Sequence, residues 1–122
     1  MERVTGIGGV FFRARDPERL RAWYAEHLGV ELADWGGHAF EAVAGDQTVW
    51  SIFSTQSDYY PRKQAAMLNY RVRDLDAMLG QLRAAGVDVE EKVDADPNGR
   101  FGWASDPEGN RFELWEPVRR SS

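Results

Sequence analysis

The residues best suited to chemistry are one carboxylate and two arginines. Glu113 lies in the alternating segment 111–116, among aromatic and aliphatic residues. Burial among such residues makes a carboxylate a stronger base, so Glu113 is a candidate general base unless an arginine pairs with it. Arg13 and Arg71 each end an apolar run, and two guanidinium groups suit the carboxylate or phosphate of a ligand. The alternative is that both arginines end their strands in solvent or pair with neighbouring acids.

Aromatic residues accompany these charged groups. Segments predicted as strands carry Phe11, Trp50, Trp103 and Trp115. Aromatic walls suit flat or apolar ligands, although the same side chains also suit a core or a dimer contact. Tyr59 and Tyr60 precede a proline in a polar segment, where they are either a flap over the pocket or a packed connector.

A repeat supplies the elements that must position these residues. Arg13-Ala14-Arg15-Asp16 recurs as Arg71-Val72-Arg73-Asp74, each time between an apolar run and an amphipathic helix pattern. Leu28-Gly29-Val30 recurs as Ala85-Gly86-Val87. One copy is too small to bury its own apolar face, whereas two copies can enclose a pocket between them.

Each copy is predicted to contain a strand, a helix and three further strands. In the first copy the strands cover 7–13, 30–35, 38–43 and 48–54, and the helix starts at Asp16-Pro17, with Asp16 as its cap, and ends at Gly29.

In the second copy the strands cover 67–72, 87–93, 100–104 and 111–116, and the helix follows Asp74 and ends at Gly86. Residues 94–99 are predicted to form a loop and 106–110 a hairpin turn.

This order predicts an α+β protein with two tandem βαβββ modules. Module one covers about 6–54, the linker 55–65 and module two about 66–117, within a single domain over 1–122. The modules are expected to form one mixed, curved, U-shaped sheet with the helices on its convex side.

Alternation along each strand predicts which side chains face the helices. The core-facing set is Val10, Phe12, Phe112 and Leu114. The concave set is Gly9, Phe11, Arg13, Met67, Asn69, Arg71, Arg111, Glu113 and Trp115. The facing of 48–54 stays open, because Trp50 and Ile52 compete with Val49 and Phe53.

Composition narrows the class of partner. The chain has 122 residues and a net charge of −5, which disfavours nucleic acid and anionic membranes. It has no cysteine, which excludes disulfides, thiolate metal sites and a cysteine nucleophile. No apolar run approaches membrane-spanning length, so we expect a cytoplasmic protein.

The chain resembles the vicinal oxygen chelate superfamily, which includes glyoxalase, bleomycin-resistance and extradiol-dioxygenase proteins. Residues 101–117 are similar to the family's closing hairpin, in which an Asp-Pro-x-Gly-Asn turn precedes a strand carrying Glu. Residues 10–29, with an Arg-Asp-Pro helix start and Trp23-Tyr24, resemble its opening unit. The resemblance implies the two-module fold and, for many members, a homodimer, in some of which the partner chain completes the concave face.

The resemblance also implies where a divalent metal would bind. Enzymes of the family hold one metal with His, Gln or Glu from the first and last strands of each half. These positions fall on Gly9, Met67, residues 49–51 and Glu113, and only Glu113 is a usual ligand. We therefore expect no metal and no other cofactor, with a divalent metal as the alternative.

Two other metal sites are weaker candidates. A His38–Glu113 site has two ligands where three are usual. The segment 94–105 begins like a calcium loop but has Ser105 where a glutamate belongs, so a surface loop is the better interpretation.

These observations favour a metal-free family member that binds and sequesters a small molecule, aromatic or anionic. Its predicted pocket comprises Phe11, Arg13, Trp50, Asn69, Arg71, Trp103, Trp115 and Glu113. Two enzyme alternatives remain open. One is a metal-dependent glyoxalase-like lyase, isomerase or dioxygenase, and the other is a metal-free enzyme with Glu113 as general base.

Overall fold

The computed structural model describes residues 1–3, 5 and 7–118, so residue 6, where module one was predicted to begin, lies outside the described residues. The described elements are α1 (Pro17–Leu28), β1 (Asn69–Arg71), α2 (Leu75–Ala84), β2 (Asp88–Val89), β3 (Asp94–Asp96), β4 (Gly99–Ser105) and β5 (Arg111–Pro117). No helix in the described part of the chain is long and apolar enough to cross a membrane.

Both helices begin directly after the predicted capping aspartates. The side chain of Asp16 accepts a 3.2 Å hydrogen bond from the Arg19 amide, and Pro17 occupies the first turn. Asp74 caps α2 in the same way, with a 3.0 Å bond from the Ala77 amide. Gly29 ends α1 at a φ of +69°, a conformation that glycine adopts without strain.

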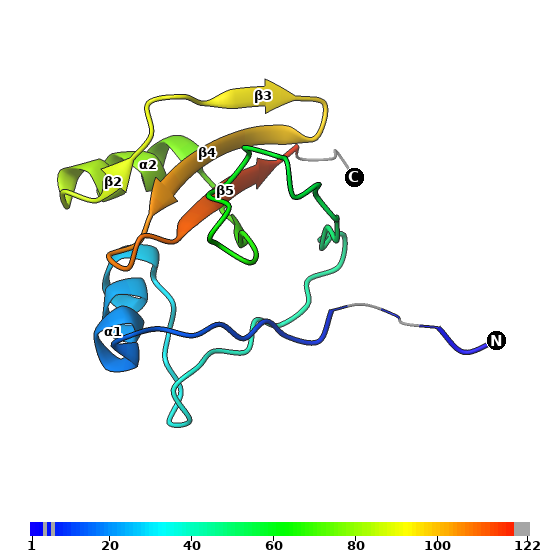
Figure 1. Cartoon of the computed structure of the whole chain (residues 1–122), viewed down its shortest axis with the longest axis horizontal. Helices are drawn as coiled ribbons and strands as arrows, with labels where there is room; N and C mark the ends of the chain where they lie inside the picture. Colours follow the sequence, from blue (N-terminus) through cyan, green and yellow to red (C-terminus); the bar gives the residue numbers. More distant parts are fainter. Residues whose placement is uncertain (4, 6, 119–122) are drawn as a thin grey trace.

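The sheet is mixed, which confirms the predicted α+β class. Its strand order is β1-β5-β4-β2, and β3 pairs with the same edge of β4 as β2. β1 runs parallel to β5, whereas the β4–β5 and β2–β4 pairs are antiparallel. Figure 1 shows α2 behind this sheet and the chain after α1 running away from it.

The core lies between the helices and one face of the sheet. Leucines 75, 79 and 82 of α2 are buried against Ala104, Phe112 and Leu114. In α1, the rings of Trp23 and Tyr24 lie 6.2 and 6.1 Å from the ring of Phe112. The predicted facing of β5 is therefore confirmed, and its other residues are left for the opposite face.

The predicted hairpin turn joins α1 to the sheet. Asp106, which is 5% exposed, accepts hydrogen bonds from the Tyr24 hydroxyl at 2.9 Å and from the Asn110 side chain at 2.8 Å. The carboxylate of Glu108 accepts from the backbone amides of Arg15 and Asp16 at 2.7 and 3.0 Å. Both contacts are long-range, so they hold α1 against the turn between β4 and β5.

The four strands predicted for the first module are wrong for this structure. None of the described residues of 7–54 belongs to a strand, and Figure 1 shows these segments extending away from the sheet. Phe11 is 93% exposed and Ile52 80%, and the expected core residues Val10 and Phe12 are also exposed, at 56% and 51%. A strand needs a neighbour for its backbone hydrogen bonds, and alternation in a sequence does not supply one.

The stretch between α2 and β4 differs from expectation in two ways. The strand predicted over 87–93 is reduced to the two residues of β2, and the predicted loop 94–99 contains β3, which folds back on β4. The Asp96 side chain accepts a 2.7 Å bond from the Asn98 amide, and Gly99 adopts a φ of +134°. This side-chain bond closes the tight turn, which is why a polar segment forms a hairpin.

Candidate functional site

Strand register assembles the candidate site on the sheet face opposite the helices. Glu113 of β5 lies directly across from Asn69 of β1 and from Trp103 of β4. Since Phe112 and Leu114 face the helices, the side chain between them faces the other way. One row across three strands therefore combines a carboxylate, an amide and an indole.

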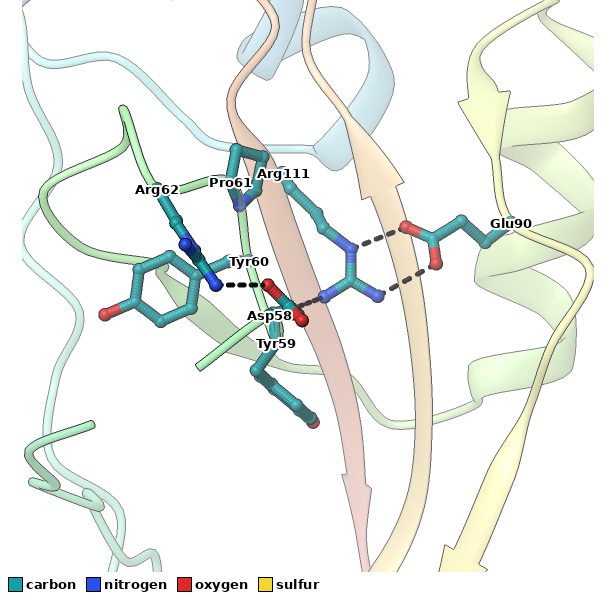
Figure 2. Close-up of a pocket in the computed structure, with 7 residues that line it drawn as sticks. All are labelled: Asp58, Tyr59, Tyr60, Pro61, Arg62, Glu90 and Arg111. Atoms are coloured by element: carbon teal, nitrogen blue, oxygen red, sulfur yellow. Dashed lines mark hydrogen bonds and ion pairs between the residues drawn. The ribbon is translucent and has the colours of Figure 1, made fainter. Parts of the chain in front are cut away.

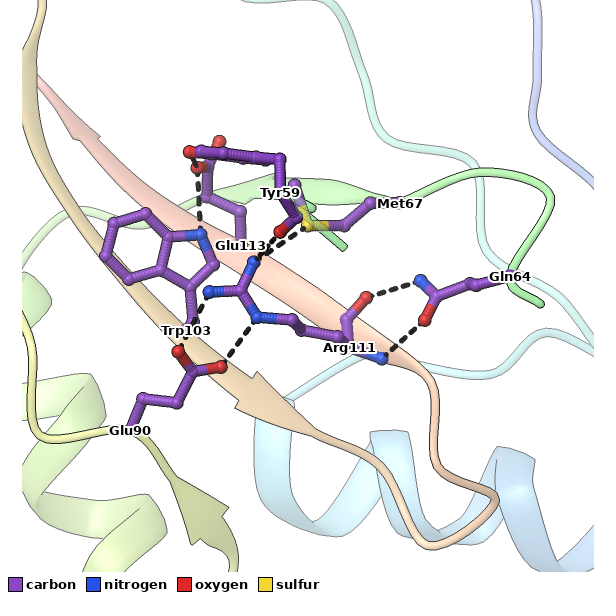
Figure 3. Close-up of polar contacts among 7 residues, drawn as sticks. All are labelled: Tyr59, Gln64, Met67, Glu90, Trp103, Arg111 and Glu113. Carbon is purple, nitrogen blue, oxygen red and sulfur yellow. Dashed lines mark hydrogen bonds and ion pairs between the residues drawn. The ribbon is translucent and has the colours of Figure 1, made fainter. Parts of the chain in front are cut away.

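Glu113 is the buried acceptor at the centre of this row. It is 7% exposed, and its oxygens accept from Asn69 Nδ2 at 2.7 Å and from Trp103 Nε1 at 3.0 Å. The hydroxyl of Tyr59, from the linker, donates to the same carboxylate (Figure 3). Burial and the hydrogen bond to Glu113 raise the pKa of Tyr59, so its hydroxyl stays protonated at neutral pH.

Arg111 covers the aromatic rings beside Glu113. Its guanidinium carbon lies 5.2 Å from the Trp103 ring centroid and 5.7 Å from that of Tyr59, within cation–π range. Its Nε and Nη2 donate to the two oxygens of Glu90 at 2.6 and 2.8 Å. The hydrogen bond from Arg111 lowers the pKa of Glu90, and the pair has no net charge.

The linker is held over this face by backbone contacts. The Gln64 side chain accepts from the Arg111 amide at 3.0 Å and donates to the Arg111 carbonyl at 2.7 Å. The Arg111 guanidinium also donates to the Tyr59 carbonyl (Figure 3). Tyr59 therefore covers Glu113, and the Tyr60 ring packs 5.8 Å from that of Phe53, contacts that a packed connector makes as well as a flap.

An open cavity of about 480 Å³ adjoins the linker. Its walls are Asp58, Tyr59, Tyr60, Pro61, Arg62, Glu90 and Arg111. Figure 2 shows its two arginines each turned toward an acid, Arg62 toward Asp58 at 3.1 Å and Arg111 toward Glu90. The cavity therefore offers aromatic surface and neutralised ion pairs next to Tyr59.

A second row of side chains lies next to the first along the same strands. Arg71, Trp115 and Phe101 are in register, and the rings of Phe101 and Trp115 stack at 6.2 Å with an interplanar angle of 1°. Trp115 Nε1 donates to the Asn98 carbonyl at 3.0 Å.

Arg71 already has partners in this row. It donates to the Gln47 carbonyl at 2.5 Å and pairs with Asp46 at 3.6 Å. These contacts are those of an arginine that binds a neighbouring acid, the alternative to a role in an anion clamp.

The structure brings together only part of the predicted pocket. Asn69, Trp103, Glu113, Arg71 and Trp115 share the face, whereas Phe11, Arg13 and Trp50 stay exposed outside it. The side chains at 49, 50, 52 and 53 are all exposed, so neither of the two alternating sets of this segment faces the core.

Sequence reasoning missed two contributors, Arg111 as a ring-covering cation and Glu90 as its partner. Alternation placed Arg111 on the correct face, and this was the available signal. For Glu90, nothing in the sequence indicates the pairing across β4.

The donor set does not fit a divalent metal. Glu113 is surrounded by N–H and O–H donors, which direct positive charge at the place where a cation would bind. Met67, at another family ligand position, accepts from Arg111 at 3.7 Å through its sulfur. His38 contacts the Glu31 carbonyl at 2.8 Å. Within residues 1–3, 5 and 7–118, no three His, Cys, Asp or Glu residues are grouped as metal ligands would be.

Comparison with known families agrees with the fold. A family model described as a glyoxalase-like domain matches residues 9–115. No curated protein matches the chain.

Several solved structures share the fold at low identity. TnmS3, an antibiotic binding protein from Streptomyces sp. CB03234, is 23% identical over 97% of this chain and 100% of its own, with a TM-score of 0.63. A glyoxalase/bleomycin resistance protein/dioxygenase superfamily member from Sphaerobacter thermophilus is 22% identical over 93% and 98%, with a TM-score of 0.58. The fosfomycin resistance protein FosX from Listeria monocytogenes is 12% identical over 95% and 96%, with a TM-score of 0.60.

Proposed function

Since the chain belongs to the family of glyoxalase-like domains, we propose that it is a cytoplasmic protein that binds a small, flat organic molecule and releases it unchanged. The binding needs no divalent metal. Two structural neighbours are described as an antibiotic binding protein and a fosfomycin resistance protein, and the class of ligand that we propose is an antibiotic. Because these neighbours share only the fold with this chain, the proposal depends on the site itself.

The observation that carries the proposal is the hydrogen bonding of Glu113. Its two oxygens accept from Asn69, Trp103 and Tyr59, which are all neutral donors. A carboxylate held in this way is a fixed acceptor with aromatic walls, and such an arrangement orients a ligand. A metal ligand would instead need free oxygen lone pairs and further ligands beside it.

The competing candidate is a metal-free enzyme with Glu113 as base. The hydrogen bond from Tyr59 favours it, because a phenol beside a carboxylate is a route for a proton. The two candidates differ in what happens to the ligand. An enzyme yields a new compound, whereas a binding protein returns the compound that it took up.

The experiment is a binding screen with a chemical readout. The purified protein is titrated with planar aromatic antibiotics while tryptophan fluorescence is followed, and each bound compound is then recovered for mass spectrometry. We expect saturable quenching and an unchanged mass. Conversion of a compound that depends on Glu113 would favour the enzyme instead.

A parallel measurement tests the metal alternative. The protein is incubated with Fe²⁺, Mn²⁺, Ni²⁺ and Zn²⁺, desalted and analysed for metal. We expect no stoichiometric retention. Retention of one equivalent of any metal would overturn the metal-free proposal and favour a metal-dependent lyase, isomerase or dioxygenase.

We also propose that the protein is a homodimer. Phe11, Trp50 and Ile52 are 93%, 73% and 80% exposed, on extended segments that pair with no strand among the described residues. A second copy of the chain offers both the apolar cover and the strand partners that these segments lack.

Light scattering after gel filtration tests the dimer. We expect twice the chain mass of 13.9 kDa, and a shift toward the monomer in Ile52→Asp. Val118→Asp, at a residue that is 55% exposed outside module one, is the matched control. A monomeric wild-type protein would overturn this proposal.

A further inference from the structure

We propose that the Tyr59 side chain stands in for the ligand. The slot that it occupies would then be a subsite for a phenolic ring, and the ligand binds by displacing Tyr59 from it. This inference rests on the proposed function, and it adds the chemical class of the group that is recognised.

Three kinds of contact define the slot. The Tyr59 ring meets the Trp103 ring nearly edge-on, at 6.1 Å and 82°. The Arg111 guanidinium lies 5.7 Å from the Tyr59 ring centroid, and the Tyr59 hydroxyl donates to Glu113. A flat, electron-rich ring with a hydroxyl donor satisfies all three contacts.

The charges in the slot favour a phenol over an anion. Glu113 is an acceptor with 7% exposure, so the carboxylate of a ligand would be repelled there. Arg111 does not offset this repulsion, because its positive charge is already neutralised by Glu90, to which it donates two hydrogen bonds of 2.6 and 2.8 Å. A hydrocarbon ring would fill the slot without replacing the hydrogen bond that Tyr59 makes, and this weakens its binding.

Tyr59 can leave the slot while the rest of the site stays in place. It belongs to the linker, outside any helix or strand, and is 39% exposed. Trp103 and Glu113 are only 2% and 7% exposed and lie on paired strands. The cavity of about 480 Å³ beside Tyr59 leaves room for the remainder of a ligand whose ring takes the slot (Figure 2).

Occupation of the slot by Tyr59 lowers the apparent affinity of the protein for its ligand. While Tyr59 fills the slot, only the fraction of molecules with the side chain displaced can bind. Removing the side chain should therefore raise the affinity for a phenol, and the vacated space has the shape of p-cresol, which is the tyrosine side chain without its backbone.

The test compares three probes on Tyr59→Ala by calorimetry: p-cresol, toluene and p-toluate. We expect p-cresol to bind about tenfold tighter than either of the others, as a hydrogen bond to a charged group implies. We also expect p-cresol to bind Tyr59→Ala more tightly than it binds the wild-type protein. Phe40→Ala, at an exposed aromatic residue that does not line the cavity, is the control and should bind p-cresol as the wild type does.

A second variant keeps the proposal testable if Tyr59→Ala does not fold. Tyr59→Phe keeps the ring and loses the hydroxyl, so its affinity for p-cresol should lie between those of the wild type and Tyr59→Ala. If Tyr59→Ala does not fold, this order between Tyr59→Phe and the wild type decides the outcome.

Other outcomes separate this inference from the proposed function. Preference for p-toluate, equal affinity for toluene, or no binding of p-cresol to folded Tyr59→Ala would each overturn the phenolic subsite. The antibiotic screen would still stand in these cases. If neither the wild type nor Tyr59→Ala binds any compound of that screen while p-cresol binds the variant, the proposed function fails and the subsite remains.

Discussion

Trp103 and Glu113 lie opposite each other on β4 and β5, and the indole Nε1 donates a 3.0 Å hydrogen bond to the carboxylate. Both side chains are buried, at 2% and 7% exposure. The polar centre of the site is therefore part of the sheet, whereas its cover, Tyr59, comes from the linker. This division suits a site with a rigid floor and a displaceable cover.

Replacing Glu113 should destabilise the fold. In Glu113→Met the buried N–H of Trp103 keeps its position and loses its acceptor, so we expect the free energy of unfolding to fall by about 1–3 kcal/mol. Urea denaturation measures this loss. Glu91→Met, at an exposed residue, should change stability by less than about 0.5 kcal/mol. Equal stability of both variants would mean that the Glu113 hydrogen bonds contribute nothing.

The hydrogen bond between Tyr24 and Asp106 should contribute more to the free energy of unfolding than an ordinary surface contact does. Tyr24→Phe removes the 2.9 Å hydrogen bond to a buried carboxylate, and we expect a loss of about 1.5–3 kcal/mol in urea unfolding. Tyr60→Phe is the control and should stay within about 0.5 kcal/mol of the wild type. If Tyr24→Phe unfolds in urea with the same free energy as the wild type, α1 packs in its place without needing this hydrogen bond.

Replacing two of the glycines with alanine should change the stability of the protein in opposite directions. At Gly99, with a φ of +134°, an added Cβ would overlap the Glu116 carbonyl oxygen, so Gly99→Ala should destabilise by more than about 1 kcal/mol. Gly80 lies inside α2 with nothing within 4 Å of an added Cβ. Gly80→Ala should therefore stabilise by about 0.5–1 kcal/mol. Thermal melting of both variants checks the opposite signs.

The Glu90–Arg111 pair should make stability depend on pH in acid. Arg111 lowers the folded-state pKa of Glu90 below its ordinary value of 4.5, so the ionised form favours the folded state. The pair therefore stabilises the protein above pH 4.5, and this stability is lost as the pH falls through the lowered pKa.

Urea unfolding at several pH values between neutral and acid tests this dependence. In Glu90→Gln the curve of stability against pH should be flatter over the acid range than in the wild type. Asp58→Gln provides a control at an exposed ion pair. Parallel curves for wild type and Glu90→Gln would contradict the assignment.

Local patterns in the sequence determined the helices, the closing hairpin and the facing of the second module. Asp16 and Asp74 cap their helices, and Phe112 and Leu114 face the core as alternation requires. These features depend on residues a few positions apart, so a single sequence contains the information. The same alternation placed Glu113 on the face where the site lies.

Tertiary structure decided what depends on a distant neighbour. The segments of 7–54 with strand-like alternation are unpaired, because a strand exists only where another strand accepts its hydrogen bonds. In the same way, the pairing of Arg111 with Glu90 and the placement of Tyr59 over Glu113 join residues far apart in the chain. The sequence by itself determined which face carries the carboxylate, and only the folded chain decided that a tyrosine would cover it.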